Sequence, residues 1–514
     1  MRAERPKSRP YVLRFIASIV VAALWAAVGV AEAAHAQLRV VVVPSLEVGD
    51  LAALSNRGAV GLLVPDAGPE TSGTRAVAAL ERGAVRNSIL GGRPAGEVVV
   101  EVETAAAIPS GPAIVLALPR GGLQPNDRRY PIAVVGEGYG GVLTSESTRI
   151  PGLVSIVDVA PTARGEGRAL GVQADDDPLG TLADLDRRIE ADRDAKPAFL
   201  LVALALLVGV AAFYRGAVLP AFAAVLVANL VIGAIGLTAV WGDVLVLVVA
   251  VAVSLLLGSA LEAQGLLMAE VLGAYLVAMA IDDRWVALSP LGPTQNARFY
   301  GLSNLLATLL LVPALAGAAL LGRRFGVWAF MAVAALAIVT VAGSSFGADG
   351  GGAIVLLAAF LVLAALEYGI DRRLAIGAAA VVAVLGLALA VGGSSHVTDA
   401  LADGPVGLAE DLGRRLRLSF ERATSGIGVG LLVFGGIAAF AALGWRERRP
   451  VLLSLLTALA VSLLVNDSPN DVVVAGLACY LVLSSAPGLA GPATGRAKPA
   501  PRAPRARTAP ASSP

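Results

Sequence analysis

The chain has 514 residues, of which 56% are hydrophobic and only 15% are charged, and its formal net charge is +1. A soluble protein needs more charge to cover its surface, so much of this chain must face lipid or be buried. A nucleic-acid-binding function is excluded, because no basic patch is interleaved with aromatic residues. The single cysteine, Cys479, excludes a disulfide framework and a cysteine-based metal site.

Residues 1–36 predict a secretory signal. The first ten residues contain four basic ones, an apolar stretch follows at 15–31, and Ala34-His35-Ala36 then provides a small-residue cleavage site. The apolar stretch is long, so an uncleaved signal anchor is the alternative. Both interpretations place the following residues outside the cytoplasm.

Residues 38–165 predict an extracytoplasmic α/β domain. Short apolar runs end in Gly, Pro or Ser, and segments with helical spacing, such as Thr74–Glu81, lie between some of them. This alternation is typical of a three-layer domain with a mostly parallel sheet. Residues 166–196 then predict a linker and a solvated polar helix, charged over Leu182–Asp194, that ends before Pro197.

Residues 197–487 predict a bundle of about eleven transmembrane helices. The expected spans are 197–214, 216–235, 239–257, 261–280, 301–321, 326–344, 351–368, 374–392, 426–444, 450–466 and 471–487. Arginines fall in most of the predicted inner loops, as the positive-inside rule requires for a bacterial cell (inner) membrane protein. The Pro- and Ala-rich basic tail at 488–514 is expected to be disordered and cytoplasmic. The fold class is therefore an α-helical polytopic membrane bundle with an N-terminal extracytoplasmic α/β domain.

Several motifs in the exported domain resemble the alkaline-phosphatase-like superfamily. They are the run Val40–Leu46 followed by Gly49–Leu51, the segments Arg129–Ile132 and Gly141–Arg149, and Gly152–Thr162, which contains Asp158-Val159-Ala160-Pro161-Thr162. The last segment is similar to the "D-x-A-P-T" segment of phosphatases, sulfatases and phosphoglycerate mutases. The resemblance covers about 38–165 and implies an α/β fold of that type.

The metal ligands and catalytic groups of that superfamily are missing. Its enzymes hold two divalent metals with Asp and His ligands, whereas Pro44-Ser45 and Leu118-Pro119 stand where the family places Asp and Asp-His. The sequence has no histidine between Gln37 and His396. Ser45 and Thr71 therefore lack a base or a metal to activate them. The resemblance implies a shortened, inactive relative used for binding or scaffolding, with no cofactor and no metal. Asp158 is expected to cap or anchor a turn.

Polar residues gather in the predicted outer loops. The candidate substrate-binding residues there are Arg298, Tyr300, Asn304, Asp349, Gly350, Gly351, Asp467 and Asp471. Arg298 is suited to clamp an anionic headgroup or phosphate, and Asn304 to line a cavity. The alternative is that Arg298 and Tyr300 only anchor the chain at the membrane interface.

Two further loops carry the remaining candidates. In the loop 344–352, consecutive glycines at a helix start could bind an anion, but a tight turn with Asp349 as N-cap is favoured. The loop 466–471 is rich in turn-forming residues. Asp349, Asp467 and Asp471 together offer oxygen ligands for a cation.

Two polar residues lie inside predicted spans, Asn229 and Glu270. An ionisable residue in an apolar span is costly and marks a candidate functional site. A structural hydrogen bond between a protonated Glu270 and Asn229 and a proton-coupled step both remain open.

Three functions follow from these features. The first is an envelope protein that binds or translocates an anionic lipid-linked or polymer precursor, with a non-catalytic ectodomain. The second is a membrane-embedded transferase or hydrolase that acts at the outer face. The third is a non-catalytic scaffold for envelope partner proteins. The lipid bilayer is the expected partner in all three.

Overall fold

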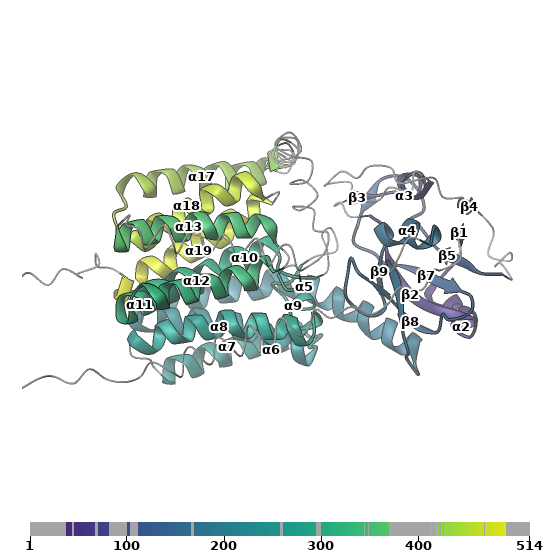
Figure 1. Cartoon of the computed structure of the whole chain (residues 1–514), viewed down its shortest axis with the longest axis horizontal. Coiled ribbons are helices and arrows are strands. Elements are labelled where there is room, and N and C mark those ends of the chain that lie inside the picture. The colour runs from purple at the N-terminus through teal and green to yellow at the C-terminus, as the bar shows by residue number, and fades with distance from the viewer. Residues whose placement is uncertain are drawn as a thin grey trace, which may run out of the picture.

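The computed structural model describes two bodies joined by one long helix (Figure 1). The described residues are 38–43, 46–66, 70–81, 100–102, 111–165, 169–257, 261–293, 300–343, 345–347, 349–369, 413, 417, 419, 420, 423, 424, 426–466 and 468–489. The predicted signal, the predicted span at 374–392 and the basic tail beyond Leu489 lie outside these residues.

The N-terminal body is built on an eight-stranded sheet with strand order β10-β8-β2-β7-β5-β1-β4, in which β9 also pairs with β2. Its strands are β1 (Arg39–Val42), β2 (Gly58–Val64), β4 (Val100–Val102), β5 (Ala113–Leu116), β7 (Tyr130–Val135), β8 (Gly141–Ser145), β9 (Leu153–Ser155) and β10 (Leu170–Gln173). A small second sheet pairs β3 (Glu70–Thr71) with β6 (Gln124–Pro125). We call this body the sheet domain.

The sheet is mixed rather than mostly parallel. Strand β7 runs antiparallel to both of its neighbours, β2 and β5, and β10 runs antiparallel to β8. The connection from β5 to β7 contains no helix, and a strand that returns without a crossover helix pairs antiparallel. The other pairings, such as β1 with β4 and β5, are parallel.

Helices cover both faces of the sheet, as the sequence predicts for this α/β region. The short helix α2 (Leu51–Ser55) and the start of α5 (Pro178–Phe213) pack on one face. Helices α3 (Gly73–Glu81) and α4 (Val159–Ala163) pack on the other. Alternate residues of β2 point to the two faces, so Leu62 joins one core and Leu63 the other.

Helix α5 belongs to both bodies. It has 36 residues and is about 54 Å long at the usual rise of an α-helix. Leu182, Leu185 and Ile189 are buried against the sheet, while Phe199 and Leu207 are buried in the bundle. Gly152, whose φ is +86°, permits this packing, because a Cβ there would lie 2.7 Å from a Leu182 methyl.

Two predictions for this segment are wrong. The polar helix does not end before Pro197, which lies inside α5, and the helix is not solvated all round. A proline inside a helix removes one backbone hydrogen bond, but burial of apolar side chains on both sides of it outweighs that loss. The i, i+3, i+7 spacing of Leu182, Leu185 and Ile189 was the signal for a buried face.

The C-terminal body is a helical bundle. Its helices are α6 (Val218–Ile235), α7 (Val240–Leu257), α8 (Leu261–Ile281), α9 (Arg284–Ala287), α10 (Asn304–Leu309), α11 (Leu311–Phe325), α12 (Val327–Ala342), α13 (Gly350–Tyr368), α17 (Ile427–Arg446), α18 (Pro450–Val465) and α19 (Pro469–Ser485). Among the described residues, six helices are long and apolar enough to cross a membrane, counting α10 and α11 as one, and four apolar helices are shorter. The number of eleven is not confirmed and stays a prediction.

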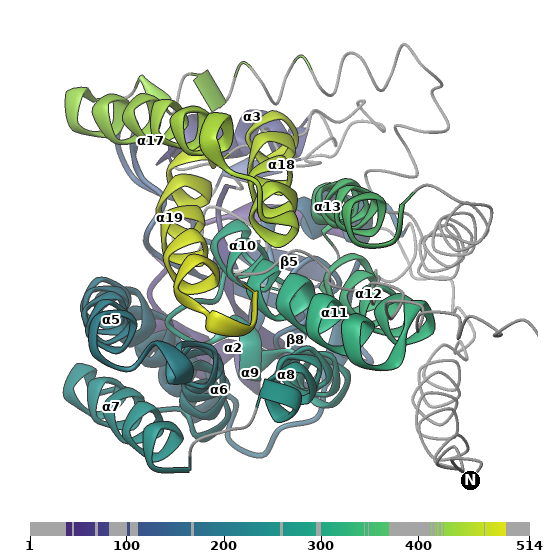
Figure 2. The same ribbon diagram turned by 90° about the vertical axis from the view of Figure 1, so that its left-hand side faces the viewer.

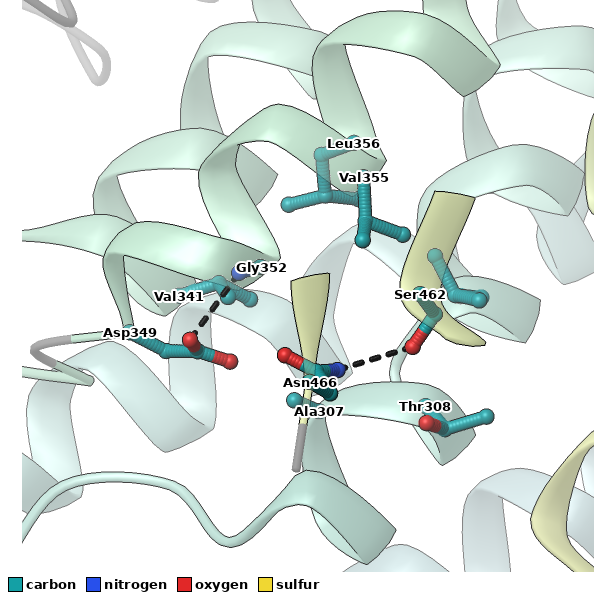
Figure 3. Close-up of a pocket in the computed structure, with 10 residues that line it drawn as sticks. Ala307, Thr308, Val341, Asp349, Gly352, Val355, Leu356, Ser462 and Asn466 are labelled. Atoms are coloured by element: carbon teal, nitrogen blue, oxygen red, sulfur yellow. Dashed lines mark hydrogen bonds between the residues drawn. The ribbon is translucent and has the colours of Figure 1, made fainter. Parts of the chain in front are cut away.

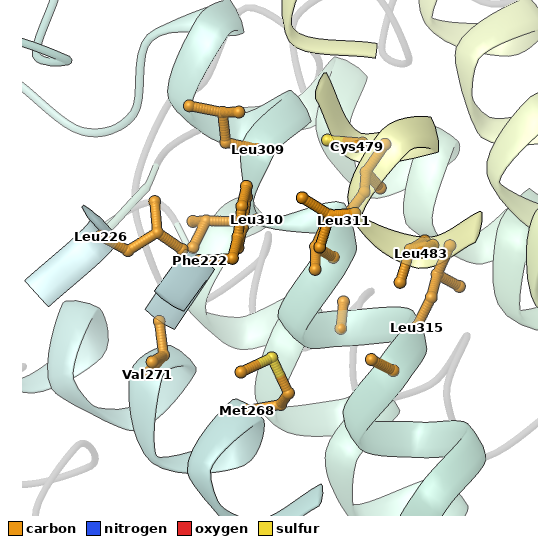
Figure 4. Packing of buried hydrophobic residues seen from close by; sticks show 14 of the residues in the cluster. Phe222, Leu226, Met268, Val271, Leu309, Leu310, Leu311, Leu315, Cys479 and Leu483 are labelled. Carbon is orange, nitrogen blue, oxygen red and sulfur yellow. The ribbon is translucent and has the colours of Figure 1, made fainter. Parts of the chain in front are cut away.

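The centre of the bundle is α10–α11, in which 94% of the most apolar window is buried (Figure 2). Leu310 separates the two helices, and Pro313 follows within the first turn of α11. Because Pro313 has no N–H, the carbonyl of Leu309 lacks its usual helical donor, which accounts for the break. Leucines on this helix pack against Phe222 of α6, Met268 of α8 and Leu483 of α19 (Figure 4).

Ion pairs fasten the end of the bundle that lies away from the sheet domain. Arg323 of α11 binds Glu367 of α13 through two nitrogens, with Nε 3.1 Å from Oε2, and donates to the carbonyl of Gly488 at 3.0 Å. Arg449 lies 2.9 Å from Glu447, which also accepts from Tyr480 of α19. We call this the distal end, and the opposite one the sheet-proximal end.

The ion pairs of Arg129 are expected to contribute to the stability of the contact between the sheet domain and α5. Its side chain is 2% exposed and pairs with Asp186 at 2.5 Å and Glu190 at 3.3 Å. Arg129→Gln should destabilise this contact by about 1 kcal/mol, because both carboxylates are partly solvated. Amide hydrogen exchange in β7 and the first half of α5 should then accelerate severalfold.

The matched control is Arg187→Gln on the same helix. Arg187 pairs with Asp184, but the two side chains are 64% and 71% exposed. Exchange should stay unchanged in this variant, and equal acceleration in both variants would contradict the proposed role of Arg129.

Candidate functional site

Two of the predicted polar loops meet at the sheet-proximal end. The N–H of Leu302 donates to the carbonyl of Gly347 at 3.1 Å, so the chain before α10 lies against the turn before α13. Gly301 has φ +72°, and a Cβ there would lie 2.2 Å from the Gly347 oxygen. Only glycine fits this contact. Ser303 then caps α10 by accepting from the N–H of Leu306 at 3.1 Å.

A small cavity lies beside this contact, between α10, α11, α12, α13 and α18, and most of the surface that lines it is apolar. Its volume is about 10 Å³, close to the space that one water needs. The polar residues that line it are Thr308, Asp349, Ser462 and Asn466 (Figure 3). All four are buried, with exposed fractions of 2–8%.

Asp349 is the N-cap of α13, which confirms the alternative that the sequence favours. Its Oδ1 accepts from the N–H of Gly352 at 2.9 Å. Its Oδ2 is buried and has no hydrogen-bond partner among the described residues. The carboxylate already uses a donor of this helix start, so a second anion at Gly350 and Gly351 would meet its negative charge.

Asn466 faces Asp349 from the end of α18. Its Nδ2 donates to Ser462 Oγ at 2.8 Å, and its backbone N–H donates to the carbonyl of Ser462 at 2.9 Å. Gly351 allows this side chain to come close, because a Cβ there would lie 2.8 Å from Asn466 Oδ1. Sequence reasoning missed Asn466, Ser462 and Thr308 as a group, since Thr308 of α10 lies far in the sequence from Ser462 and Asn466 at the end of α18 and no local pattern connects them.

The other predicted residues are dispersed. Tyr300 lies under the guanidinium of Arg149, 4.0 Å from its ring centroid. Asn304 begins α10, and its carbonyl accepts from Thr308 Oγ1 at 2.7 Å. Asp471, in the first turn of α19, interacts electrostatically with Lys196. Arg298 and Asp467 lie outside the described residues, so the predicted cation site of Asp349, Asp467 and Asp471 stays a prediction.

Of the two alternatives for Asn229 and Glu270, the hydrogen bond between them is wrong, and the proton-coupled step stays a prediction. Asn229 is fully buried and donates to Ser289 Oγ at 3.0 Å and to the Tyr275 hydroxyl at 3.3 Å. Its Oδ1 accepts from the N–H of Leu291 at 2.9 Å. Glu270 lies instead on the exposed surface of α8. Asn229 therefore has a structural role, tying α6 to α8 and to the segment after α9.

In the sheet domain, Asp158 anchors a turn, as expected. It accepts from the Ser147 hydroxyl at 2.7 Å, from the Ser147 N–H at 3.2 Å and from the Ser145 hydroxyl. Burial raises the pKa of Asp158 to about 6, although these hydrogen bonds act in the opposite direction.

Of the two residues considered as nucleophiles, the structure describes only Thr71. Thr71 is 1% exposed, so a substrate cannot reach its hydroxyl, and Ser45 lies outside the described residues. Within the described part of the chain, no group of three or more His, Cys, Asp or Glu side chains is placed to hold a metal ion.

Comparisons with protein-family models, curated proteins and solved structures found no match to this chain. The resemblance of the sheet domain to the alkaline-phosphatase-like superfamily therefore stays a prediction. Function must be argued from the geometry of the chain itself.

Asn229→Ala should destabilise the bundle by about 2 kcal/mol, because it leaves the Leu291 N–H without its acceptor in an apolar interior. Cys479, the single cysteine, is fully buried, so a thiol-reactive dye reports unfolding of the bundle. Ser254→Ala is the control, since Ser254 donates only to Val251 of its own helix. If Asn229→Ala and Ser254→Ala lowered the melting temperature equally, the proposed structural role of Asn229 would be contradicted.

The raised pKa of Asp158 predicts that the stability of the folded sheet domain depends on pH. Its pKa is raised in the folded state, so the folded state holds the proton more tightly and stability falls as pH rises from about 4 to about 6. Amide protection factors in β8 should drop about tenfold between pH 4.5 and pH 7 in the full-length protein. Asp158→Asn mimics the protonated form and should flatten this profile. An unchanged profile in the variant would assign the dependence to another group.

Proposed function

We propose that the protein is a bacterial cell-membrane protein of the envelope that binds or translocates an anionic lipid-linked or polymer precursor. The sheet domain is its non-catalytic extracytoplasmic module, and the C-terminal tail is cytoplasmic. The apolar helices support a membrane location, and the arginines of the predicted inner loops support this orientation.

The observation that carries the proposal is the fixed position of the sheet domain on the sheet-proximal end. Helix α5 runs unbroken from the sheet into the bundle, and Ala287 and Leu288 after α8 join the apolar core of the sheet domain. Arg188 of α5 also donates to the carbonyl of Gly233 at the end of α6, at 2.8 Å. A domain held by three such contacts keeps its loops at the membrane surface, where the headgroup of a lipid-linked ligand lies.

Arg149 is the residue best placed to meet such a headgroup. It sits in the turn between β8 and β9 with φ +55°, a conformation that costs free energy in a non-glycine residue and is concentrated at functional sites. The guanidinium group of Arg149 stacks on Tyr300 of the bundle, and this contact holds the guanidinium group between the sheet domain and the bundle. Guanidinium groups bind phosphate with two parallel hydrogen bonds. Arg298 precedes Tyr300 by two positions in the sequence.

The test is the affinity of the full-length protein in nanodiscs for undecaprenyl phosphate compared with uncharged undecaprenol. The wild-type protein should bind the phosphate at least tenfold more tightly, which corresponds to about 1.4 kcal/mol. Arg149→Gln should lose most of that preference while keeping the affinity for undecaprenol.

Arg187→Gln provides the matched control, because it removes the same charge from an exposed ion pair on α5. The preference for phosphate should survive in this variant. Equal affinities of the wild-type protein for the two lipids would contradict an anionic lipid-linked ligand.

A further inference from the structure

We propose that the cavity at Asp349 binds one monovalent cation, Na⁺, between the start of α13 and the end of α18. This site is separate from the headgroup site at Arg149 and does not depend on the proposed ligand. It would hold the two helices together at the sheet-proximal end.

The first argument is that two hydrogen-bond acceptors face each other. Figure 3 shows the second carboxylate oxygen of Asp349 directed toward the side-chain oxygen of Asn466. The amide nitrogen of Asn466 is engaged with Ser462, which sets the orientation of the amide. The Asp349 Oδ2 atom is buried and unpartnered among the described residues. A buried carboxylate oxygen that faces another acceptor, and has no donor of its own, needs a positive charge or a proton beside it.

The second argument is the charge of the helix end. Asn466 is the C-cap of α18, so the cavity lies at the negative end of that helix dipole. The positive end of α13 is already balanced by Asp349, which caps it. A cation is stabilised by both the carboxylate and the α18 terminus, as at the ion sites of broken transmembrane helices.

Size and charge then select the ion. A volume of about 10 Å³ admits one small particle, and one carboxylate balances a single positive charge. Calcium takes six to eight oxygen ligands, usually with several carboxylates, which this cavity does not offer within the described residues. Thr308 and Ser462 also line the cavity with hydroxyl groups, and in Figure 3 they lie on the other side of Asn466 from Asp349. Ser462 accepts from the amide nitrogen of Asn466 and so helps to keep the amide oxygen directed toward Asp349.

The site also joins the central helix to its neighbours. Thr308 belongs to α10 and Leu311 to α11, on either side of the break at Leu310, and both line the cavity. An ion bound between Asp349 and Asn466 contacts α13 and α18, and the cavity that holds it extends to α10. Occupancy should therefore stabilise the bundle as well as neutralise Asp349.

The experiment measures ²²Na⁺ binding to the full-length protein by scintillation proximity, with K⁺ and choline as competitors. We expect about one Na⁺ per chain, and a melting temperature, followed through Cys479, that is several degrees higher in NaCl than in choline chloride. Asp349→Asn should lower the affinity at least tenfold and abolish the Na⁺-dependent shift. Asparagine caps helices as well as aspartate does, so this variant should fold.

Asp177→Asn is the matched control. Asp177 is also an N-cap, of α5, and accepts from the N–H of Gly180 at 3.1 Å, but it lies outside the bundle. This variant should bind Na⁺ like the wild-type protein. Ser462→Ala keeps the Asp349 carboxylate and should weaken Na⁺ binding severalfold. If Asp349→Asn does not fold, the Na⁺ affinity of Ser462→Ala tests the proposal in its place.

Three results would overturn the proposal. They are a wild-type protein that binds no Na⁺ and melts alike in all three chlorides, Na⁺ binding that survives in both cavity variants, and equal loss in Asp177→Asn. The first result would mean that a proton on Asp349, or a turned Asn466 amide, joins the two side chains instead.

Discussion

The arrangement of the whole protein depends on the continuity of α5. One face of its first half completes the core of the sheet domain, and its second half is a helix of the bundle. The angle between the two bodies is therefore set by a helix rather than by a flexible linker. Arg129 and Arg188 fix the rotation of this helix, because one binds it to the sheet domain and the other binds it to α6.

Polar residues inside the bundle divide into two kinds. Asn229 uses its amide fully, with partners on α8 and in the segment after α9, and it behaves as a structural tie. Asp349 uses one oxygen as a helix cap and leaves the other buried without a partner among the described residues. A buried polar group with all its hydrogen bonds made contributes to the stability of the fold. A buried polar group without a partner requires a ligand or a proton.

The sequence predicts the elements that are governed by local patterns. Apolar runs locate the helices of the bundle that the structure describes, and short apolar runs ended by Gly or Pro locate β1, β2, β5 and β7. The N-cap role of Asp349 is also local, since it depends on a residue three positions away. These features need no knowledge of tertiary contacts.

Features that depend on distant contacts were predicted poorly. The continuation of α5 through Pro197 is stabilised by two separate cores, which no window around the proline contains. The partners of Asn229 lie on other elements, and the antiparallel placement of β7 depends on the whole connection from β5. The polar residues of the cavity come from α10, α13 and α18, and only packing brings them together.

The break between α10 and α11 lies between two ends of the bundle that different kinds of interaction hold together. At the distal end, Arg323 and Glu367 tie α11 to α13, and Glu447 ties the turn before α18 to α19. At the sheet-proximal end, the six residues of α10 are separated from α11 at Leu310, and five of them are buried. Ion pairs therefore stabilise the distal end of the bundle, whereas apolar burial and the contacts with the sheet domain stabilise the sheet-proximal end.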